Sequence, residues 1–520
     1  MSEQEVSRLW QMYRAGQDYL TGLDLPRTVK ENVAFYEGRQ WGRVTPATKN
    51  MPRPVVNIVK MVCRNKRARL ALSPVKLVYK CQSNPALGDR FTRFADYMAK
   101  EMRLKELDSR AIKDGVVKGS YCYHFYWDPD CHDTLGEDKG ALRCELIDPL
   151  NVLFANPREM DEQKQDWVMI VSRMPLGKVK QLADRGVDES ILLADDDQTD
   201  RGEDRLCTVL TRYFRVEGEV YCERALKLGM LNAPFALSPS TYGTEGGEVV
   251  QISKTHAGLY PIVFGSYEER EGSVYGLSEV EGIIPNQKVL NHILGMEAMA
   301  IQNTAWGKFV VTKDALKGQQ ISNEPGEVLV DHSASGNGIR RLPYGAMTGI
   351  PLSYVDSLSA MTRSVTGSSE IMTGEQLRNM SGAAIIALQA QANQPIEEAR
   401  ERFWRSKERQ GKVLAQCCLL YYDSKEWYDE DGTPSRQIFV ADDYEGVPMA
   451  VTVQACQGTG SSTAADVSLL ETLFARGAID ALTFVNAYPE EALNDKEGIL
   501  RCVQGYAEAA TRATIADPSA

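Results

Sequence analysis

The segment from Val289 to Ile301 is apolar around most of the circumference of a helix. Its one charged side chain, with histidine neutral, is Glu297, and its apolar residues occur at 289, 290, 293, 294, 296, 299 and 301. A surface helix usually carries one apolar stripe, so a helix that is apolar on most sides must be covered on several of them. Left bare on a monomer, it would promote aggregation. We therefore expect either the same chain or identical copies of it to cover this helix.

The helix that contains this segment is expected over 277–303. Ser278 stands directly before the helical pattern and is expected to act as its N-cap. Pro285 is expected to kink the helix or to begin its main segment, because proline removes a backbone donor inside a helix.

An ordered series of elements follows this helix. We expect a second helix over 351–367, a polar stretch over 367–380 and a long helix over 381–422, in which Pro395 predicts a kink near Gln391. Between the first two helices, alternating apolar residues separated by Gly, Asn and Ser turns indicate short strands at 308–312, 326–331 and 338–344.

The polar stretch before the long helix could be a phosphate cradle, a lid or a segment that touches a partner. A phosphate loop needs a lysine after its glycines, and none follows here. A lid needs a catalytic site to cover, and the sequence offers none. A flexible polar segment between two helices is the interpretation that remains.

The flanking regions indicate a mixed α+β chain. The N-terminal part is expected to contain a helical segment within 1–45, a strand in "PVKLVYKC", a helical segment over 90–118 ended by Gly119, and a β-rich zone that runs to about 267. Strands are expected over 426–456 and helices over 464–510.

An amphipathic helix is expected after Pro54. Its apolar positions are 55, 58, 59 and 62, and it ends in a basic cluster of Arg64, Lys66, Arg67 and Arg69.

Composition excludes several classes of protein. The 520 residues suffice for two to four domains, and 43% hydrophobic with 25% charged residues is ordinary for a soluble globular protein. No run of 18 apolar residues predicts a transmembrane helix, and the polar start "MSEQEVSRLWQMYRAG" indicates no secretory signal. A net charge of −12 is unsuited to a protein that clamps nucleic acid over its whole surface.

Catalytic and metal-binding patterns are also missing. The eleven cysteines form no CxxC pair and are expected to be reduced thiols, and no HExxH or GxSxG motif occurs. "GTGSS" at 458–462 lacks the lysine of a phosphate loop. A zinc site is an alternative for one histidine and cysteine cluster, but its spacings fit no usual zinc motif; its members are Cys122, His124, Cys131, His132 and Cys144. We expect no enzyme, no metal and no cofactor.

Three quoted motifs accompany the ordered series of elements. They are "FYEGRQWG" and "RPVVNIVK" near the start and "PIVFGSYEEREGSVYGLSEVEGIIPNQKVLNHI" in the middle. With the long helix that begins "SGAAII", the chain resembles portal proteins of tailed bacteriophages, the short-tailed-phage type most closely. The resemblance covers roughly residues 30 to 505 and rests on the ordered combination, because no single residue type is chemically obligatory.

The resemblance implies a ring, usually of twelve subunits, at one capsid vertex. Double-stranded DNA would enter through its axial channel during packaging and leave through it at infection. The large subunit of the terminase would dock first and head-to-tail adaptors later, and major capsid and scaffolding proteins would surround the ring. Assembly in the cytoplasm of a host bacterium, no contact with a membrane and no hydrolysis by the portal itself are implied.

The resemblance also implies a division of the chain, namely a portal fold with a mixed α/β wing, a two-helix stem, a small β-containing clip, a long kinked wing helix and a short helical crown. The crown is short, and the presence of a helical barrel extension is left open. The parts are the wing (1–276 and 381–461), the stem helices (277–303 and 350–366), the clip (304–349), the tunnel loop (367–380) and the crown (462–520).

Candidate functional residues follow from this division. In the tunnel loop they are Glu370, Glu375, Arg378 and Asn379, of which the last two are the candidates for transient phosphate contacts. Capping or ion pairing with a neighbouring subunit is the alternative role for Arg378 and Asn379. The loop has no aromatic platform, so stacking on single-stranded bases is not expected.

The stem and clip offer further candidates. Lys288 could face the channel or a solvated surface, and Ile293 and Leu294 are expected to pack between subunits. In the clip, Arg340 and Arg341 would suit an acidic partner or be ordinary hairpin charges.

A phage structural or scaffold component without a channel is the competing class of protein, and a nuclease or NTPase is disfavoured by the missing motifs.

Overall fold

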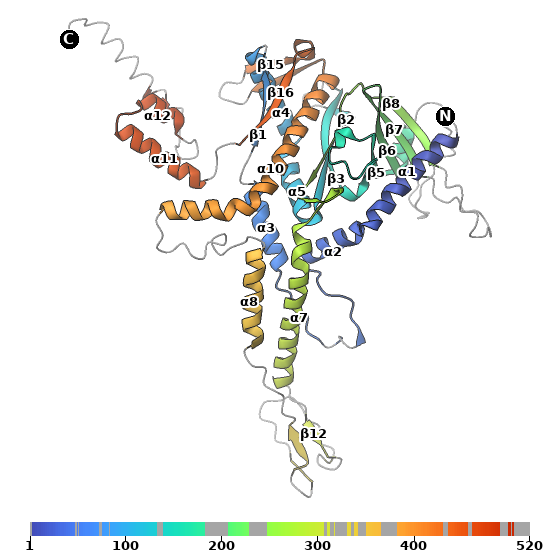
Figure 1. The fold of residues 1–520 in the computed structure, drawn as a ribbon, viewed down its shortest axis with the longest axis vertical. Coiled ribbons are helices and arrows are strands. Elements are labelled where there is room, and N and C mark those ends of the chain that lie inside the picture. The colour runs from blue at the N-terminus through green and yellow to red at the C-terminus, as the bar shows by residue number, and fades with distance from the viewer. Residues whose placement is uncertain are drawn as a thin grey trace.

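The computed structural model has a broad mixed α/β body from which two helices project as a column, with a small strand pair at the far end of that column (Figure 1). The fold class is α+β, as the sequence predicts. The structure describes residues 3–46, 49, 51–71, 75–82, 84–132, 139–182, 206–227, 247–305, 309–312, 317, 330–333, 337–341, 350–365, 382–429, 435–455, 460–488, 498–500 and 502–503.

Two antiparallel sheets form one side of the body. The larger has the order β4-β5-β6-β7-β8, in which each strand pairs with the next one along the chain: β4 (Val152–Phe154), β5 (Trp167–Pro175), β6 (Leu206–Val216), β7 (Glu219–Lys227) and β8 (Gly247–Lys254). The smaller has the order β3-β2-β9: β2 (Ser120–His132), β3 (Lys139–Ile147) and β9 (Ile262–Ser266). Helix α1 (Glu3–Gly22) packs against β4 and β8, and a short helix, α6 (Leu176–Leu182), follows β5.

The other side of the body is helical. Its helices are α2 (Leu25–Glu37), α3 (Ile58–Ala71), α4 (Pro85–Glu101) and α5 (Leu104–Lys118). The expected amphipathic helix after Pro54 is α3, which buries Ile58, Val59 and Val62.

The segment 90–118 is two helices rather than the single helical segment that its spacing suggests. Arg103 adopts the left-handed conformation with φ 53° between α4 and α5. The break lets Met102 and Leu104 both enter the same core, with exposures of 5% and 3%. Because no glycine or proline marks the position, tertiary packing rather than local sequence decides the break.

Distant parts of the chain close the body. β1 (Val75–Cys81) pairs antiparallel with β16 (Met449–Ala455), and the hairpin β14 (Ser424–Asp429) and β15 (Ser435–Val440) lies next to α4. The rings of Phe94 and Phe439 stack with centroids 4.1 Å apart. Gly88 permits the close approach of α4 to β1, since a Cβ there would lie 2.7 Å from the carbonyl oxygen of Tyr79.

The projecting column consists of α7 (Glu279–Ala305) and α8 (Ile350–Val365), with the strand pair β12 (Phe309–Val311) and β13 (Ile339–Arg341) at its end (Figure 1). A hairpin of β10 (Glu268–Arg270) and β11 (Ser273–Leu277) precedes α7. α7 is helical on both sides of Pro285. Of the strand expected at 326–331, only 330–331 are described, and they are not strand.

The long helix α10 (Gly382–Tyr421) packs against β9 and β16 and changes direction along its length (Figure 1). Beyond β16, α11 (Gly460–Ala475) and α12 (Ala481–Ala487) pack on each other through stacked rings of Phe474 and Phe484. The carboxylate of Asp480 caps α12 by accepting a hydrogen bond from the amide of Thr483.

Candidate functional site: the projecting helices and their anchorage

Helix α7 begins with a capping box. Ser278 Oγ accepts hydrogen bonds from the amides of Val280 (3.1 Å) and Glu281 (3.3 Å), and Glu281 Oε1 accepts one from the amide of Ser278 (3.2 Å). The side chain of Asn32 in α2 donates to Ser278 Oγ at 2.9 Å. The predicted N-cap is confirmed, and it also joins α7 to α2.

An almost buried ion pair lies at the same end of α7. Lys66 Nζ of α3 is 2.7 Å from Glu279 Oε2, and their side chains are 8% and 11% exposed. Tyr267 donates a hydrogen bond to the same carboxylate oxygen at 3.0 Å. Burial, reinforced by the charge of Glu279, raises the pKa of the Cys63 thiol to about 12. Removing one partner would leave an unpaired buried charge, so this pair holds α3 and α7 in one arrangement.

A chain of buried amides fixes α7 about two turns further along. Gln287 accepts a hydrogen bond from the amide of Ile58 (3.0 Å) and donates to the carbonyl of Val56 (2.8 Å) and to Asn291 Oδ1 (2.9 Å). Asn291 then donates to Gln40 Oε1 at 2.7 Å. All three amide side chains are less than a tenth exposed. Buried amides that satisfy each other have one good arrangement, so the network orients the projecting helix.

Trp41, Met51 and Pro52 lie against α7 at Gly295. A Cβ at this glycine would lie 2.9 Å from Met51 Cε and 3.0 Å from the carbonyl oxygen of Pro52. The indole of Trp41 donates a hydrogen bond to the carbonyl of Pro54 at 3.1 Å. Glycine is therefore required here by close approach, not by backbone conformation.

The two projecting helices are joined by a polar contact. Asn286 of α7 donates to Thr362 Oγ1 of α8 at 3.1 Å, and Thr362 donates to the carbonyl of Leu358 at 2.8 Å. Thr362 is 2% exposed. This contact fixes the register of α8 on α7 near the body.

Large apolar side chains remain exposed on both helices. On α7 they are Val289, Met296 and Ile301, with exposures of 43%, 43% and 63%, and on α8 they are Tyr354 and Met361, with 52% and 65%. Val289 and Met296 are seven residues apart, as are Tyr354 and Met361, so each pair lies on one helix face. The helix pair therefore presents apolar surface on both of its members.

The residues that the sequence selected on α7 lie in different surroundings. Ile293 and Leu294 are both half-buried, and Leu294 packs against the main core. Lys288 Nζ is 2.7 Å from Glu31 Oε1 of α2 and lies 5.4 Å from the ring centroid of Phe35. Helical periodicity identified the apolar positions of α7, but the exposed ones follow only from the packing of the 41–54 segment and α8.

The strand pair at the end of the column places Arg340 opposite Val310, and Arg340 is exposed. Arg341 pairs with Phe309 through the backbone. Asp331 accepts hydrogen bonds from the amides of Ser333 (2.8 Å) and Gly338 (2.7 Å), and these backbone donors lower its pKa. The tunnel-loop candidates lie outside the described residues: Glu370, Glu375, Arg378 and Asn379.

Residues 241–454 match the family described as phage P22-like portal protein. No curated protein matches the chain. This match supports a tailed-phage portal protein of the short-tailed, P22-like type. The matched residues contain both projecting helices and α10. Portal proteins are structural components of the virion at a capsid vertex and associate in rings, so the exposed apolar faces of α7 and α8 belong to a protein whose family assembles.

Three features are absent from the described part of the chain, namely metal-binding clusters, disulfide bonds and membrane-spanning helices. Its histidine, cysteine, aspartate and glutamate side chains form no group of three or more that could hold a metal ion. No cysteine whose placement is described forms a disulfide bond. Among the helices that can be described, none is long and apolar enough to cross a membrane.

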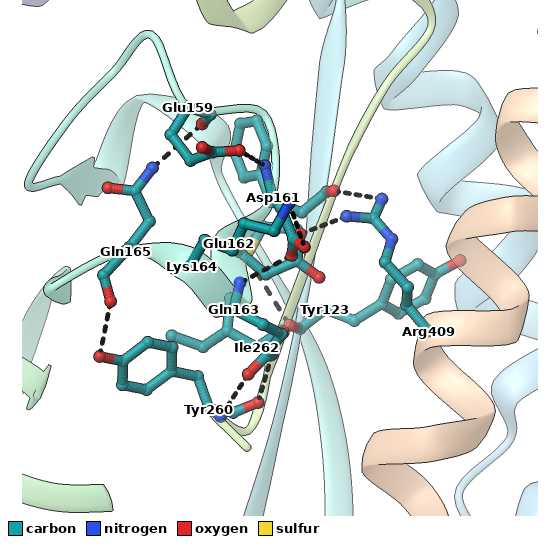
Figure 2. A network of polar contacts seen from close by, with 12 residues as sticks. Tyr123, Glu159, Asp161, Glu162, Gln163, Lys164, Gln165, Tyr260, Ile262 and Arg409 are labelled. Atoms are coloured by element: carbon teal, nitrogen blue, oxygen red, sulfur yellow. Dashed lines mark hydrogen bonds and ion pairs between the residues drawn. The ribbon is translucent and has the colours of Figure 1, made fainter. Parts of the chain in front are cut away.

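A second polar network ties α10 of the portal protein to the sheets (Figure 2). Glu162, at the start of the 3-10 turn η3 (Glu162–Lys164), is 0% exposed and forms an ion pair with Arg409 of α10. Arg409 also donates to the carbonyl of Phe264 in β9 at 2.9 Å. Burial raises the pKa of Glu162 to about 7, although the positive charge of Arg409 acts in the opposite direction. The neighbouring Gln163 accepts a hydrogen bond from the amide of Tyr260 at 2.8 Å.

Proposed function

We propose that this portal protein forms the ring through which double-stranded DNA enters the capsid and later leaves it. In this proposal α7 and α8 are the stem, residues 304–349 the clip and 367–380 the tunnel loop. Residues 1–276 and 381–461 form the wing, and 462–520 form the crown.

The exposed apolar faces of α7 and α8 are the observation that supports this proposal. Identical neighbours on both flanks of each subunit would cover Met296 on one helix and Met361 on the other. A head-to-tail contact of this kind closes into a ring when the rotation from one subunit to the next is a whole-number fraction of a full turn. The seven-residue spacing on both helices suits side-by-side packing of helix pairs from adjacent subunits.

The charge of the chain supports a conduit. A channel wall rich in lysine and arginine would hold phosphates and hinder sliding, whereas this chain has a net charge of −12. Lys288, the candidate cation on the first stem helix, is already paired with Glu31. We propose that Arg378 and Asn379 of the tunnel loop make transient contacts with the DNA phosphates.

The clip is the proposed docking surface for the terminase and then for head-to-tail adaptors. Arg340 is exposed on the terminal strand pair, and Arg341 is its neighbour. An exposed cation at the end of a projecting column suits an acidic partner, because complementary charge accelerates docking.

Imaging of the purified protein tests this proposal. Wild-type protein should form rings with a central hole in negative stain, and the double variant Met296→Asp/Met361→Asp should remain monomeric while unfolding at an unchanged temperature. Val216→Asp is the matched control, because Val216 is 46% exposed at the end of β6 in the body. A wild-type protein that stays monomeric at high concentration and several salt concentrations would refute the ring. Normal rings from the double variant would refute the role of Met296 and Met361 in the contact between subunits.

A further inference from the structure

The helices α3 and α5 pack on each other, both contact α7 (Figure 1), and carry nine basic side chains, of which six have no ion-pair partner among the described residues. These six form what we call the basic patch: Lys60, Arg64 and Arg67 on α3, and Lys105, Arg110 and Lys113 on α5. The three on α3 are four and three residues apart, which places them on one helix face. Arg67 donates a hydrogen bond to Ser109 at 2.8 Å, so this face of α3 adjoins α5 at the turn between Lys105 and Lys113.

The charge of the patch is not neutralised locally. Within the described part of the chain, none of the six takes part in an ion pair, and Lys113 lies 5.7 Å from the ring centroid of Tyr36. Helix α3 contains no acidic residue. Besides the three patch members and Arg69 it carries one further cation, Lys66, which is paired with Glu279. On α5 the acidic side chains Asp108 and Asp114 are paired with Lys407 and Lys118. Glu106 is the acidic side chain of α5 left near the patch.

We propose that the basic patch binds the phosphate backbone of double-stranded DNA. Clustered cations without carboxylate partners recognise a polyanion, and a net charge of −12 makes the patch a local exception on this chain. The proposal rests on the proposed function, in which DNA is the macromolecule that the ring handles.

The surroundings of the patch favour a duplex over an acidic protein or a single strand. A protein interface needs apolar or aromatic anchors, and neither α3 nor α5 has a large apolar side chain among the exposed ones. A single strand needs exposed aromatic rings for its bases to stack on, and α3 and α5 contain none in their sequences.

The dimensions of the patch also suit a duplex. At about 1.5 Å of rise per residue, Lys105 to Lys113 spans about 12 Å. That length is matched by roughly three phosphates of one strand, at about 3.4 Å each. The contact would be independent of base sequence, since it involves the phosphates and no base edge.

The test compares two triple variants that lower the net charge equally. The patch variant is Arg64→Gln/Arg110→Gln/Lys113→Gln. The control variant is Arg405→Gln/Lys412→Gln/Arg436→Gln, whose three cations are ion-paired with Glu401, Glu408 and Glu426. Binding of a short duplex of arbitrary sequence is measured by fluorescence anisotropy over a range of salt concentrations, after circular dichroism has compared the folding of the variants.

The patch variant should bind the duplex more weakly and with a smaller salt dependence than the wild type. Loss of three phosphate contacts lowers the magnitude of the slope of log affinity against log salt by about 2.7. Between about 50 and about 200 mM salt, the affinity of the wild type should therefore fall by a factor about 40 times larger than the affinity of the patch variant. The control variant should behave like the wild type. Equal affinities and slopes for the two triple variants would overturn the proposal.

A second measurement uses the unaltered chain and so does not depend on folding of the variant. The duplex should protect Lys60, Lys105 and Lys113 of the wild type from an amine-reactive reagent, and it should not protect Lys412. Equal reactivity with and without duplex would overturn the proposal. Displacement of the duplex by polyglutamate at the same charge concentration would also overturn it, in favour of an acidic protein partner. If rings form normally but the patch and control variants bind the duplex equally, this inference alone is refuted. If the wild type forms no rings, the proposed function is refuted.

Discussion

Glu162 and Arg409 form an ion pair between residues 247 positions apart in the chain, and the carboxylate is completely buried (Figure 2). The contact joins the turn before β5 to the long helix α10. One carboxylate oxygen, Oε1, has no hydrogen-bond partner. Desolvation of the carboxylate therefore outweighs the attraction of Arg409, which is why the pKa of Glu162 lies near 7 rather than near 4.5.

This pair should make stability depend on pH. The folded state holds the Glu162 proton up to about pH 7, whereas the unfolded chain releases it near 4.5. The stabilising contribution is therefore complete below pH 4.5 and is lost as pH rises through about 7. The loss is on the order of 3 kcal/mol, from about 1.4 kcal/mol per pH unit.

Glu162→Gln removes the titrating group and should flatten this dependence. The measurement is the free energy of unfolding by denaturant across the pH range, for this variant, the wild type and Glu408→Gln. Glu408 is the control: it lies next to Arg409 on α10, and its side chain is 42% exposed. If Glu162→Gln loses stability with rising pH as steeply as the wild type, another group is responsible.

The amide network should be sensitive to the loss of one member. Asn291→Leu removes the donor to the buried Gln40 Oε1 and one of the two acceptors of Gln287 Nε2, so unfolding should become easier by about 2 kcal/mol or more. His292→Leu, at the adjacent exposed position of α7, should change stability by less than about 0.5 kcal/mol. Thermal unfolding followed by circular dichroism measures both, and equal losses would show that the network does not stabilise the junction.

Substitutions on α7 should separate folding from assembly. Met296→Asp introduces a charge at an exposed position and should prevent rings while leaving the unfolding temperature unchanged. Leu294→Asp should prevent rings and also lower the unfolding temperature, because Leu294 packs against the main core. Ile293 is also half-buried, so Ile293→Asp should prevent rings too. Size-exclusion chromatography with melting curves distinguishes the variants, and rings from Leu294→Asp or Ile293→Asp would contradict the packing argument.

Two glycines of α7 should respond to alanine with opposite signs. Gly295→Ala forces a Cβ against Met51 and the backbone of Pro52, so it should destabilise the protein by about 1 to 3 kcal/mol. Gly282→Ala meets nothing within 4 Å and should stabilise the helix by up to about 1 kcal/mol. Limited proteolysis of the 41–54 segment gives a second readout, since only Gly295→Ala should expose it.

Replacing residues 370–379 with a Gly-Ser linker tests the proposed tunnel loop. The change removes Arg378 and Asn379 but leaves α7, α8 and α10 intact, so rings should still form. Packaging or retention of DNA in assembled heads should be impaired. Unchanged packaging by rings of normal appearance would show that this segment does not act on DNA.

Local chemistry accounts for what the sequence alone determined. Ser278 and Glu281 are three residues apart, so their capping box could form without the rest of the fold. The strand at β1 and the start of α3 follow in the same way from alternation and from the position of Pro54. The order of helices and strands from 277 to 422, together with the three quoted motifs, indicated the portal family, which the match over residues 241–454 supports.

Contacts between distant residues decided the rest. Periodicity on α7 could not tell that Leu294 meets the core while Met296 stays exposed, because the difference depends on where α8 and the 41–54 segment lie. Lys288 could not be paired with Glu31 from sequence, nor α3 with α5 into one basic patch. Helix and strand propensities act within a few residues, whereas burial and ion pairing depend on segments hundreds of residues apart, which only the folded chain brings together.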